Sequence, residues 1–260
     1  LRLQDGSVKW ELSPVELESI AVVVEGCSVS AAAVELAARY GIDLTFMSGD
    51  RPVARLLPAS YGSTMRNWLL QLRASESPEE SAKLARAFVE GKLHNQRMVL
   101  AEYAKRLRAS GRPSAELEEA MGRVEGCLSK LRGAKSAEEA MSLEAHAAKA
   151  YWEAVASILP PELGFEARHT RSRPPPGGEL DAFNSALNIG YSVLRREVWR
   201  AVFLAGLNPY VGFLHKHRPG RMSLVLDLME EFRPVSVDRP LIGMARRGGE
   251  GLESIARAEG

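Results

Sequence analysis

Hydrophobic and polar positions change their spacing along the chain near residue 60. Before that point, short apolar runs separated by turn residues predict buried strands, and SVSAAAVELAARYG has the spacing of one amphipathic helix. Ser28 or Ser30 can cap this helix at its start. The pattern predicts a small strand-rich N-terminal domain at residues 1–60, with strands in SIAVVVEG, DLTFMSG and PVARLLP.

After residue 60 the apolar residues recur at helical spacing. Several of these segments begin with Ser followed by acidic residues, which satisfy the free N–H groups of a first helical turn. A Pro- and Gly-rich break, PPELGFEARHTRSRPPPGGELD, precedes two further helices in FNSALNIGYSVLRREVWRAVFLAG and SLVLDLMEEF. The sequence therefore predicts an α+β fold of two domains, with a larger all-α C-terminal domain at residues 61–260.

Length and composition narrow the class of protein. With 260 residues, 45% of them hydrophobic, the chain can bury a sizeable core. No apolar run approaches the roughly 20 residues that span a bilayer, and the start LRLQDGSVKW does not have the apolar stretch of a signal peptide. We therefore expect a cytoplasmic protein without a membrane partner. The two cysteines, Cys27 and Cys127, have no nearby partner, so a bound metal must use oxygen and nitrogen ligands.

Charge is balanced over the whole chain but not within it. The 34 basic residues almost cancel the 33 acidic ones. Between Glu162 and Arg221, however, nine Lys and Arg face five Asp and Glu, a local excess of four positive charges. This basic segment suits contacts with phosphate groups, although a solvated face rich in arginine is an equal alternative.

The segment SLVLDLMEEF carries carboxylates on a mostly apolar helix. Asp227 and Glu230 lie three residues apart and therefore share one face. Two like charges crowded there need a cation, unless they pair with arginines such as Arg233 or face water. His215 precedes this helix by a short turn that could return its imidazole towards Glu230, although a lone histidine after an apolar run is more often a core residue.

A third candidate ligand lies upstream in MSLEAHAAKAYWEAV. Glu144 is followed by small alanines that let another helix approach closely, whereas taken alone it would be a solvent-exposed residue. Together, Glu144, His215 and Glu230 offer two carboxylates and one imidazole, which suit Mg²⁺ or Mn²⁺ better than a structural zinc site. Such an ion can polarise a phosphoryl oxygen. The adjacent basic turn could then hold neighbouring phosphates through Lys216, Arg218 and Arg221.

Four segments in the same order resemble a known family, the CRISPR-associated integrase/endonuclease that inserts new spacers into the repeat array. They are GKLHNQR, LEAHAAKAYWEAV, FEARHTRSRPPP with NSALNIGYSVL, and the long GFLHKHRPGRMSLVLDLMEEFRP. The resemblance runs from about Ser19 to Arg239. Mild departures are Ala145, where the family often has Gly, and Lys149, where it often has Arg.

The resemblance implies an N-terminal domain that forms a homodimer and a helical domain that holds one divalent metal. Its ligands fall on Glu144, His215 and Glu230, with Asp227 as a further acidic position of the catalytic site. The implied substrates are double-stranded and branched DNA, the implied partner is a small ferredoxin-like CRISPR-associated protein, and the implied reaction is attack of a 3′ hydroxyl on the repeat strand. Further matches near the substrate or supporting the site are Asn184, Tyr191, Arg218 and Arg233, and Lys92, Asn95 and Gln96 of GKLHNQR also match.

Two other interpretations of the sequence compete with that of a metal-dependent DNA integrase and nuclease. One is a catalytically inactive DNA-binding scaffold of the same fold, against which the presence of all three implied ligands argues. The other is a helical scaffold without a nucleic-acid role, whose arginines only solvate the surface. Because the chain begins with Leu1 and the family usually has more strand sequence there and more helix at the end, we also expect further segments at both ends.

Overall fold

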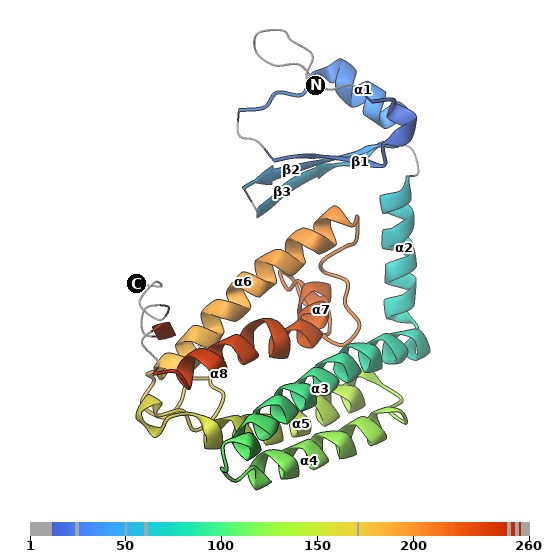
Figure 1. Cartoon of the computed structure of the whole chain (residues 1–260). Helices are drawn as coiled ribbons and strands as arrows, with labels where there is room; N and C mark the ends of the chain where they lie inside the picture. Colours follow the sequence, from blue (N-terminus) through green and yellow to red (C-terminus); the bar gives the residue numbers. More distant parts are fainter. Residues whose placement is uncertain are drawn as a thin grey trace. The chain divides into compact units, whose positions relative to one another are not determined.

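A computed structural model describes residues 12–23, 26–49, 51–59, 62–170, 172–248, 251–252 and 255. Helices predominate among these residues and follow a small sheet (Figure 1), so the predicted α+β class is confirmed. The first eleven residues, where no signal peptide was expected, and Val24 and Glu25 of the first predicted strand lie outside the described part. No helix of the described residues has the length and apolar character needed to cross a bilayer.

The chain packs as two compact units. The first comprises Leu1–Arg73 with Trp199–Asn208, and the second comprises Ala74–Val198 with Pro209–Gly260. The first unit thus extends past residue 60, where the sequence analysis put the domain boundary, and it also takes in Trp199–Asn208. The boundary at residue 60 stays a prediction, because helical spacing begins there whereas the packing changes one helix later.

The first unit is built on a three-stranded sheet in the order β1 (Ser19–Val22), β2 (Asp43–Ser48) and β3 (Arg51–Leu56). Strands β1 and β2 are parallel, with Ser19 opposite Asp43, and β2 and β3 are antiparallel. Between the parallel strands runs α1 (Ala31–Arg39), which Ser30 caps by accepting a hydrogen bond from Ala33 N–H at 3.2 Å. Its buried Ala37 packs on Leu44 of β2.

A polar network completes the first unit. Asp43 of β2 accepts hydrogen bonds from Arg55 of β3 at 3.3 Å and from Thr64 at the start of α2 (Ser63–Glu76). In the C-terminal half of α2, the Gln71 side chain donates one hydrogen bond to the backbone oxygen of Asn208 and accepts one from its N–H. These contacts fix α2 within the unit that carries the sheet.

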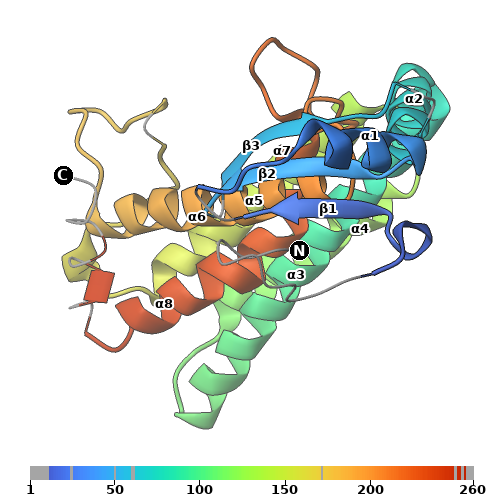
Figure 2. The same ribbon diagram turned by 90° about the horizontal axis from the view of Figure 1, so that it is seen from above.

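The second unit is helical. Three long antiparallel helices, α3 (Pro78–Ala109), α4 (Ala115–Leu131) and α5 (Ala137–Ile158), pack side by side in both views (Figures 1 and 2). A long loop with one short 3-10 turn at Pro161–Leu163 leads from α5 to α6 (Ala182–Leu204). The break predicted from Pro and Gly is therefore confirmed as a loop.

The last helices form a nearly continuous rod with an unpredicted change of pitch. The expected helix SLVLDLMEEF is α7 (Ser223–Arg233), which continues through a π-helical turn, Pro234–Asp238, into α8 (Arg239–Ala245). Pro234 and Pro240 have no N–H to donate to the preceding turn, so the regular ladder is interrupted there. The π turn packs on α3 and places Asp238 in the interior.

The core of the second unit surrounds α3 and α5. Tyr103 of α3, Tyr151 of α5 and Phe183 of α6 are almost fully buried in one cluster. Gly190 lets α6 approach the π turn closely, because a Cβ there would lie 2.5 Å from Val237. This packing brings α3, α5, α6 and α7 together around one polar pocket.

Candidate active site

Three helices bring opposite charges together within the helical unit. Lys92 of α3 donates through Nζ to Glu230 Oε2 of α7 at 2.5 Å and to Glu144 Oε1 of α5. Only 9% of the Lys92 side chain, 5% of Glu230 and 17% of Glu144 are exposed. One ammonium group thus bridges two of the carboxylates that the sequence singled out.

Local sequence explains why these helices begin where they do. The Ser77 hydroxyl accepts from Glu80 N–H at the start of α3, and the Ser136 hydroxyl accepts from Glu139 N–H at the start of α5. Both helices therefore have the Ser-acid start expected from the sequence. Helix α7 has no side-chain cap and is positioned by its buried apolar face of Leu224, Val225 and Met229.

Electrostatics keeps the bridged groups charged. Burial alone would raise the pKa of Glu230, but the charges of Lys92 and Arg233, with a smaller contribution from His215, hold this pKa at about 2. Burial likewise opposes the charged form of Lys92, yet Glu230 and Glu144 raise its pKa above the ordinary value. The carboxylate of Glu230 is thus held in its charged form, which attracts a cation.

Asp227 binds both the backbone and the imidazole of His215. The Asp227 carboxylate is fully buried and accepts the backbone N–H groups of Phe213, Leu214 and His215 at 2.6 to 3.0 Å. Its Oδ1 also lies 2.8 Å from Nδ1 of His215. Gly212 is needed beside it, because a Cβ at that position would lie 2.7 Å from Oδ2 of Asp227. Asp227 therefore orients the imidazole and leaves Nε2 as its free nitrogen.

The three candidate ligands do not form a ready-made metal cage. Among the residues that the structure describes, no group of three His, Cys, Asp or Glu side chains is arranged to hold a metal ion. Glu144 and Glu230 converge on the Lys92 ammonium instead, whereas His215 Nδ1 faces Asp227. The donor set is nevertheless of the kind that hard divalent cations prefer, and its two carboxylates already accept one cation in common.

A pocket of about 600 Å³ opens beside Lys92 and Glu144. Basic side chains line it from two sides, with Lys149 on α5 and Arg168 and Arg173 on the loop before α6. Tyr191 of α6, Arg233 and Asp238 also contribute to its wall. The arrangement can receive an anionic group next to the buried carboxylates.

Asn184 holds the loop that carries Arg168. Its buried Oδ1 accepts from Arg168 Nη1 at 3.0 Å and from His169 N–H at 2.9 Å. Its Nδ2 donates to Ala167 O and to Asp181 Oδ2. All of its polar atoms are engaged by the protein, so this predicted residue supports the site from within.

Tyr191 and Arg233 join the pocket wall to the π turn. The Tyr191 hydroxyl donates to Asp238 Oδ1 at 2.5 Å, and the guanidinium groups of Arg233 and Arg168 lie 5.0 and 5.2 Å from the Tyr191 ring. Arg233 also pairs with Glu230 at 3.3 Å. Burial raises the pKa of Asp238 to about 6, although the Tyr191 hydrogen bond opposes this shift.

The basic turn after His215 lies outside this pocket. Lys216, Arg218 and Arg221 are not among its lining residues, and Lys216 pairs with Glu138 at 2.8 Å. Lys216 and His215 line a separate hollow of about 340 Å³. The proposed contact of these three cations with substrate phosphates therefore stays a prediction.

Sequence reasoning named Lys92 as a match to the family without giving it a role in the site, and it missed Arg168 and Asp238. For Lys92 a signal existed, since Lys92 and Gln96 lie one turn apart and interrupt an otherwise apolar stripe of α3, and both are buried. Arg168 lies in the loop whose FEARHTR motif the sequence highlighted. Asp238 had no local signal because the π turn that turns it inward was not predicted.

Fold and pocket together define an α+β protein whose helical unit holds buried carboxylates beside a basic opening. A sequence model of the family described as "CRISPR associated protein Cas1" matches residues 2–252. The chain is 45% identical over 248 residues to "CRISPR-associated endonuclease Cas1 1" of Saccharolobus solfataricus, covering 95% of this chain and 66% of the relative. It is 35% identical to "CRISPR-associated endonuclease Cas1" of Korarchaeum cryptofilum, covering 89% of this chain and 69% of the relative.

The solved structure of a "Casposase bound to integration product" has a similar fold. It matches with a TM-score of 0.75 and 26% identity, covering 92% of this chain and 67% of that one. The chain belongs to the CRISPR-associated Cas1 family. It spans about two thirds of the length of these relatives.

Proposed function

We propose that the chain is a divalent-metal-dependent DNA endonuclease and integrase of CRISPR adaptive immunity. In this reaction a 3′ hydroxyl of spacer DNA attacks a phosphodiester of the repeat array, the new phosphodiester forms, and the former 3′ oxygen of the repeat strand leaves with a proton. The observation that carries the proposal is the convergence of the partly buried Glu144 and the buried Glu230 on one cation, the ammonium of Lys92. Membership of the family and the names of the similar proteins support it.

Glu144, Glu230 and Nε2 of His215 would hold Mg²⁺ or Mn²⁺. Such an ion supplies charge stabilisation for the attacked phosphate and lowers the pKa of a bound hydroxyl. Asp227 keeps Nδ1 of His215 engaged, so Nε2 is the nitrogen left for a ligand role. Lys92 balances the two carboxylates before the ion arrives and remains a cation at the edge of the site.

The basic wall of the pocket would bind the DNA backbone. Arg168 is fixed by Asn184 and by Asn188, whose Oδ1 lies 2.6 Å from Nη2. A guanidinium held in this way loses little conformational freedom when it binds a phosphate. Lys149 and Arg173 add positive charge at the same opening. We assign these three residues to phosphate positioning and not to bond breaking.

A second candidate function is a DNA-binding scaffold without chemistry. The ion pairs of Lys92 and Arg233 favour it, because these two cations together already neutralise the carboxylates of Glu144 and Glu230. The implied homodimer and the small ferredoxin-like partner fit either function, and both belong to this proposal.

A strand-transfer assay tests the function directly. Supercoiled DNA is incubated with a short duplex that carries free 3′ hydroxyls, in Mn²⁺ or in EDTA, with and without the small partner. We expect joining in Mn²⁺ that is lost in EDTA and in Glu144→Ala. The matched control is Glu125→Ala on α4, an exposed carboxylate with one exposed ion pair to Arg97, which should retain joining.

The outcomes separate the candidates. Salt-dependent DNA binding by the wild type without joining would favour the scaffold. Absence of salt-dependent DNA binding would favour a role without nucleic acid. Joining that survives in Glu144→Ala would contradict the metal assignment.

A further inference from the structure

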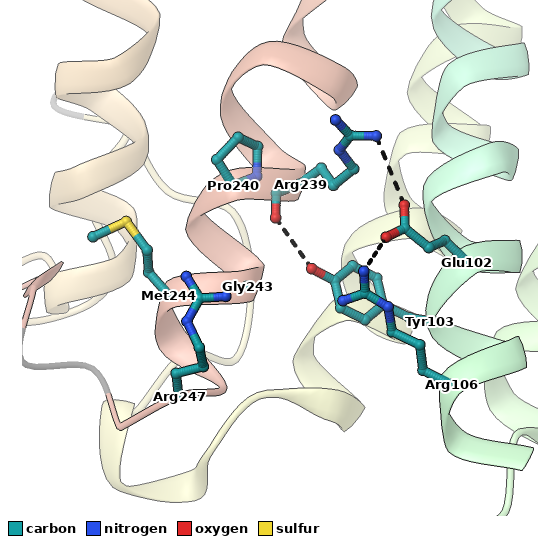
Figure 3. Close-up of a pocket in the computed structure, with 8 residues that line it drawn as sticks. All are labelled: Glu102, Tyr103, Arg106, Arg239, Pro240, Gly243, Met244 and Arg247. Atoms are coloured by element: carbon teal, nitrogen blue, oxygen red, sulfur yellow. Dashed lines mark hydrogen bonds and ion pairs between the residues drawn. The ribbon is translucent and has the colours of Figure 1, made fainter. Parts of the chain in front are cut away.

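A second pocket lies near the C-terminal end of α3, between α3 and α8, and we call it the arginine pocket (Figure 3). It has a volume of about 500 Å³. Its lining includes Glu102, Tyr103 and Arg106 of α3, Arg239 and Gly243 of α8, and Arg247 just after α8. It shares no lining residue with the pocket beside Glu144.

The floor of the arginine pocket is rigid. Tyr103 is buried in the core of the helical unit, and its hydroxyl donates to the backbone oxygen of Arg239 at 3.1 Å. The guanidinium groups of Arg106 and Arg246 each lie 5.3 Å from the centre of the Tyr103 ring. The start of α8 is thereby fixed on α3, and the arginines project from a firm base.

Positive charge in this pocket exceeds what the neighbouring carboxylate can balance. Glu102 contacts both Arg106 and, at 3.8 Å, Arg239, so one negative charge is shared by two guanidiniums. Arg247 forms no ion pair with any carboxylate in the described part of the chain. Burial and then the nearby charge of Arg112 lower the pKa of Arg246, which shows like charges crowded beside the pocket.

We propose that the arginine pocket is a second phosphate-binding site that holds the backbone of duplex DNA away from the point of strand breakage. Exposed guanidinium forks match the oxygen geometry of a phosphodiester and carry no cost of breaking a buried pair. The Arg106 and Arg239 side chains are 60% and 51% exposed, so a backbone can reach them. The choice of DNA over an acidic protein segment rests on the proposed function.

Geometry gives the site a minimum reach. At about 1.5 Å per residue, the path along α3 from Lys92 to Arg106 is about 21 Å. Successive phosphates of one strand lie about 3.4 Å apart along a duplex, so DNA that touches both pockets must extend about six base pairs beyond the reacting phosphate. Shorter arms reach only one pocket.

Equilibrium binding in EDTA tests the site without any need for catalysis. The affinity of a fluorescent DNA duplex is measured against salt for the wild type, Arg239→Gln/Arg247→Gln, and the matched control Arg108→Gln/Arg132→Gln. Arg108 is also on α3, but it does not line the arginine pocket and pairs with Glu118. Arg132 directly follows α4 and is exposed. We expect the slope of log K against log salt to fall by about 2 in the first double variant and to change by less than about half as much in the control.

A second arm uses the predicted reach. Nicking and joining in Mn²⁺ are compared on branched substrates whose duplex arm beyond the reacting phosphate is roughly 3 or roughly 12 base pairs long. For Arg239→Gln/Arg247→Gln, the ratio of long-arm to short-arm activity should fall about tenfold relative to the wild type. Matching thermal melts check that both double variants are folded.

The other outcomes bear either on the arginine pocket as a DNA site or on the proposed function of the chain. An equal loss of slope in both double variants, or no loss in either, would overturn the arginine pocket as a DNA site. Displacement of DNA by poly-glutamate from the wild type, but not from Arg239→Gln/Arg247→Gln, would assign the pocket to an acidic protein segment instead. A wild type that binds DNA but never joins it in Mn²⁺ would contradict the proposed function, while the slopes in EDTA would still decide the second site.

Discussion

The middle and the C-terminal end of α3 place charge in opposite ways. Around Lys92, at the middle, the charges are mostly buried and of both signs, and each group has a charged partner within contact distance. Around Arg106, in the last turn, they are exposed and mostly positive, and one carboxylate contacts two arginines. The same helix thus supports an electrostatically closed cluster at its middle and an open basic surface at its end.

This difference has energetic consequences. A buried ion pair is costly to break from one side, because the remaining charge is left without water or partner. An exposed pair contributes between about zero and 1 kcal/mol, and salt screens it. We therefore expect substitutions around Lys92 to change stability strongly, and substitutions in the arginine pocket to change DNA affinity while stability barely moves.

The largest effect should come from Lys92→Met. It leaves the buried carboxylates of Glu144 and Glu230 facing each other without their shared cation, so we expect the free energy of unfolding to fall by about 3–5 kcal/mol near neutral pH. Stability should recover partly as the pH falls towards 5, because one carboxyl can then take up a proton. Chemical denaturation across this pH range measures both effects.

The control for Lys92 lies on the same helix. Lys83 is 66% exposed and forms an i,i+3 pair with Glu80 at 3.8 Å, so Lys83→Met should cost less than about 1 kcal/mol. Mn²⁺ should raise the melting temperature of Lys92→Met more than that of the wild type, because the ion then replaces the missing cation. An equal response to Mn²⁺ in both proteins would argue against a metal position between the two carboxylates.

Asp227→Asn should have the next largest effect. The amide can accept with only one oxygen, so in either orientation its NH₂ group faces at least one of the backbone N–H groups that the carboxylate now accepts. We expect a loss of roughly 3 to 4 kcal/mol in unfolding free energy. Mn²⁺ affinity measured by calorimetry should also fall roughly 10- to 100-fold, because His215 loses the group that orients it. Unchanged Mn²⁺ affinity in a folded variant would contradict a ligand role for His215.

The sequence predicted the fold class and most helices because their signals are local. Ser77 and Ser136 precede acidic first turns, and both cap their helices as expected. Glu144 and Glu230 were identified chiefly by resemblance to a family, since spacing alone left both compatible with ordinary surface residues. Their convergence depends on how α3, α5 and α7 pack, which no short motif encodes.

The missed elements depend on long-range contacts. Asp238 faces inward only because the π turn shifts the phase of the last helices, and the two prolines that permit this shift also fit an ordinary helix end. The packing of residues 62–73 with Trp199–Asn208 likewise includes hydrogen bonds between Gln71 and Asn208, which are far apart in sequence. Such contacts override the pattern of the intervening residues.

Asp238→Asn should change the pH dependence of stability by a moderate amount. Burial raises the pKa of Asp238 from 3.8 to about 6 in the folded state. The folded protein therefore binds this proton more tightly than the unfolded chain, so the stabilisation is complete below about pH 4 and is lost as the pH rises through about 6. Over that range the loss amounts to at most about 3 kcal/mol.

Comparison of the two proteins isolates this carboxyl. An amide cannot ionise but still accepts from Tyr191, so the unfolding free energy of Asp238→Asn relative to the wild type should increase between pH 4 and 7. Denaturation curves at several pH values measure the difference. A difference that stays constant over this range would mean that Asp238 is ionised throughout, with a partner stronger than those around Tyr191.

The smallest predicted effect has the opposite sign and belongs to the cations beside the arginine pocket. Arg112 is exposed, and its charge lowers the pKa of Arg246 after the larger effect of burial. Arg112→Gln should therefore stabilise the protein by a few tenths of a kcal/mol at low salt, whereas Arg108→Gln, which breaks the pair with Glu118, should destabilise it by a similar amount. Both differences should vanish near 1 M salt, where the screening length is about 3 Å. Calorimetric melting temperatures at low and high salt measure them, and a loss of stability in Arg112→Gln would show that the cations of this region are balanced after all.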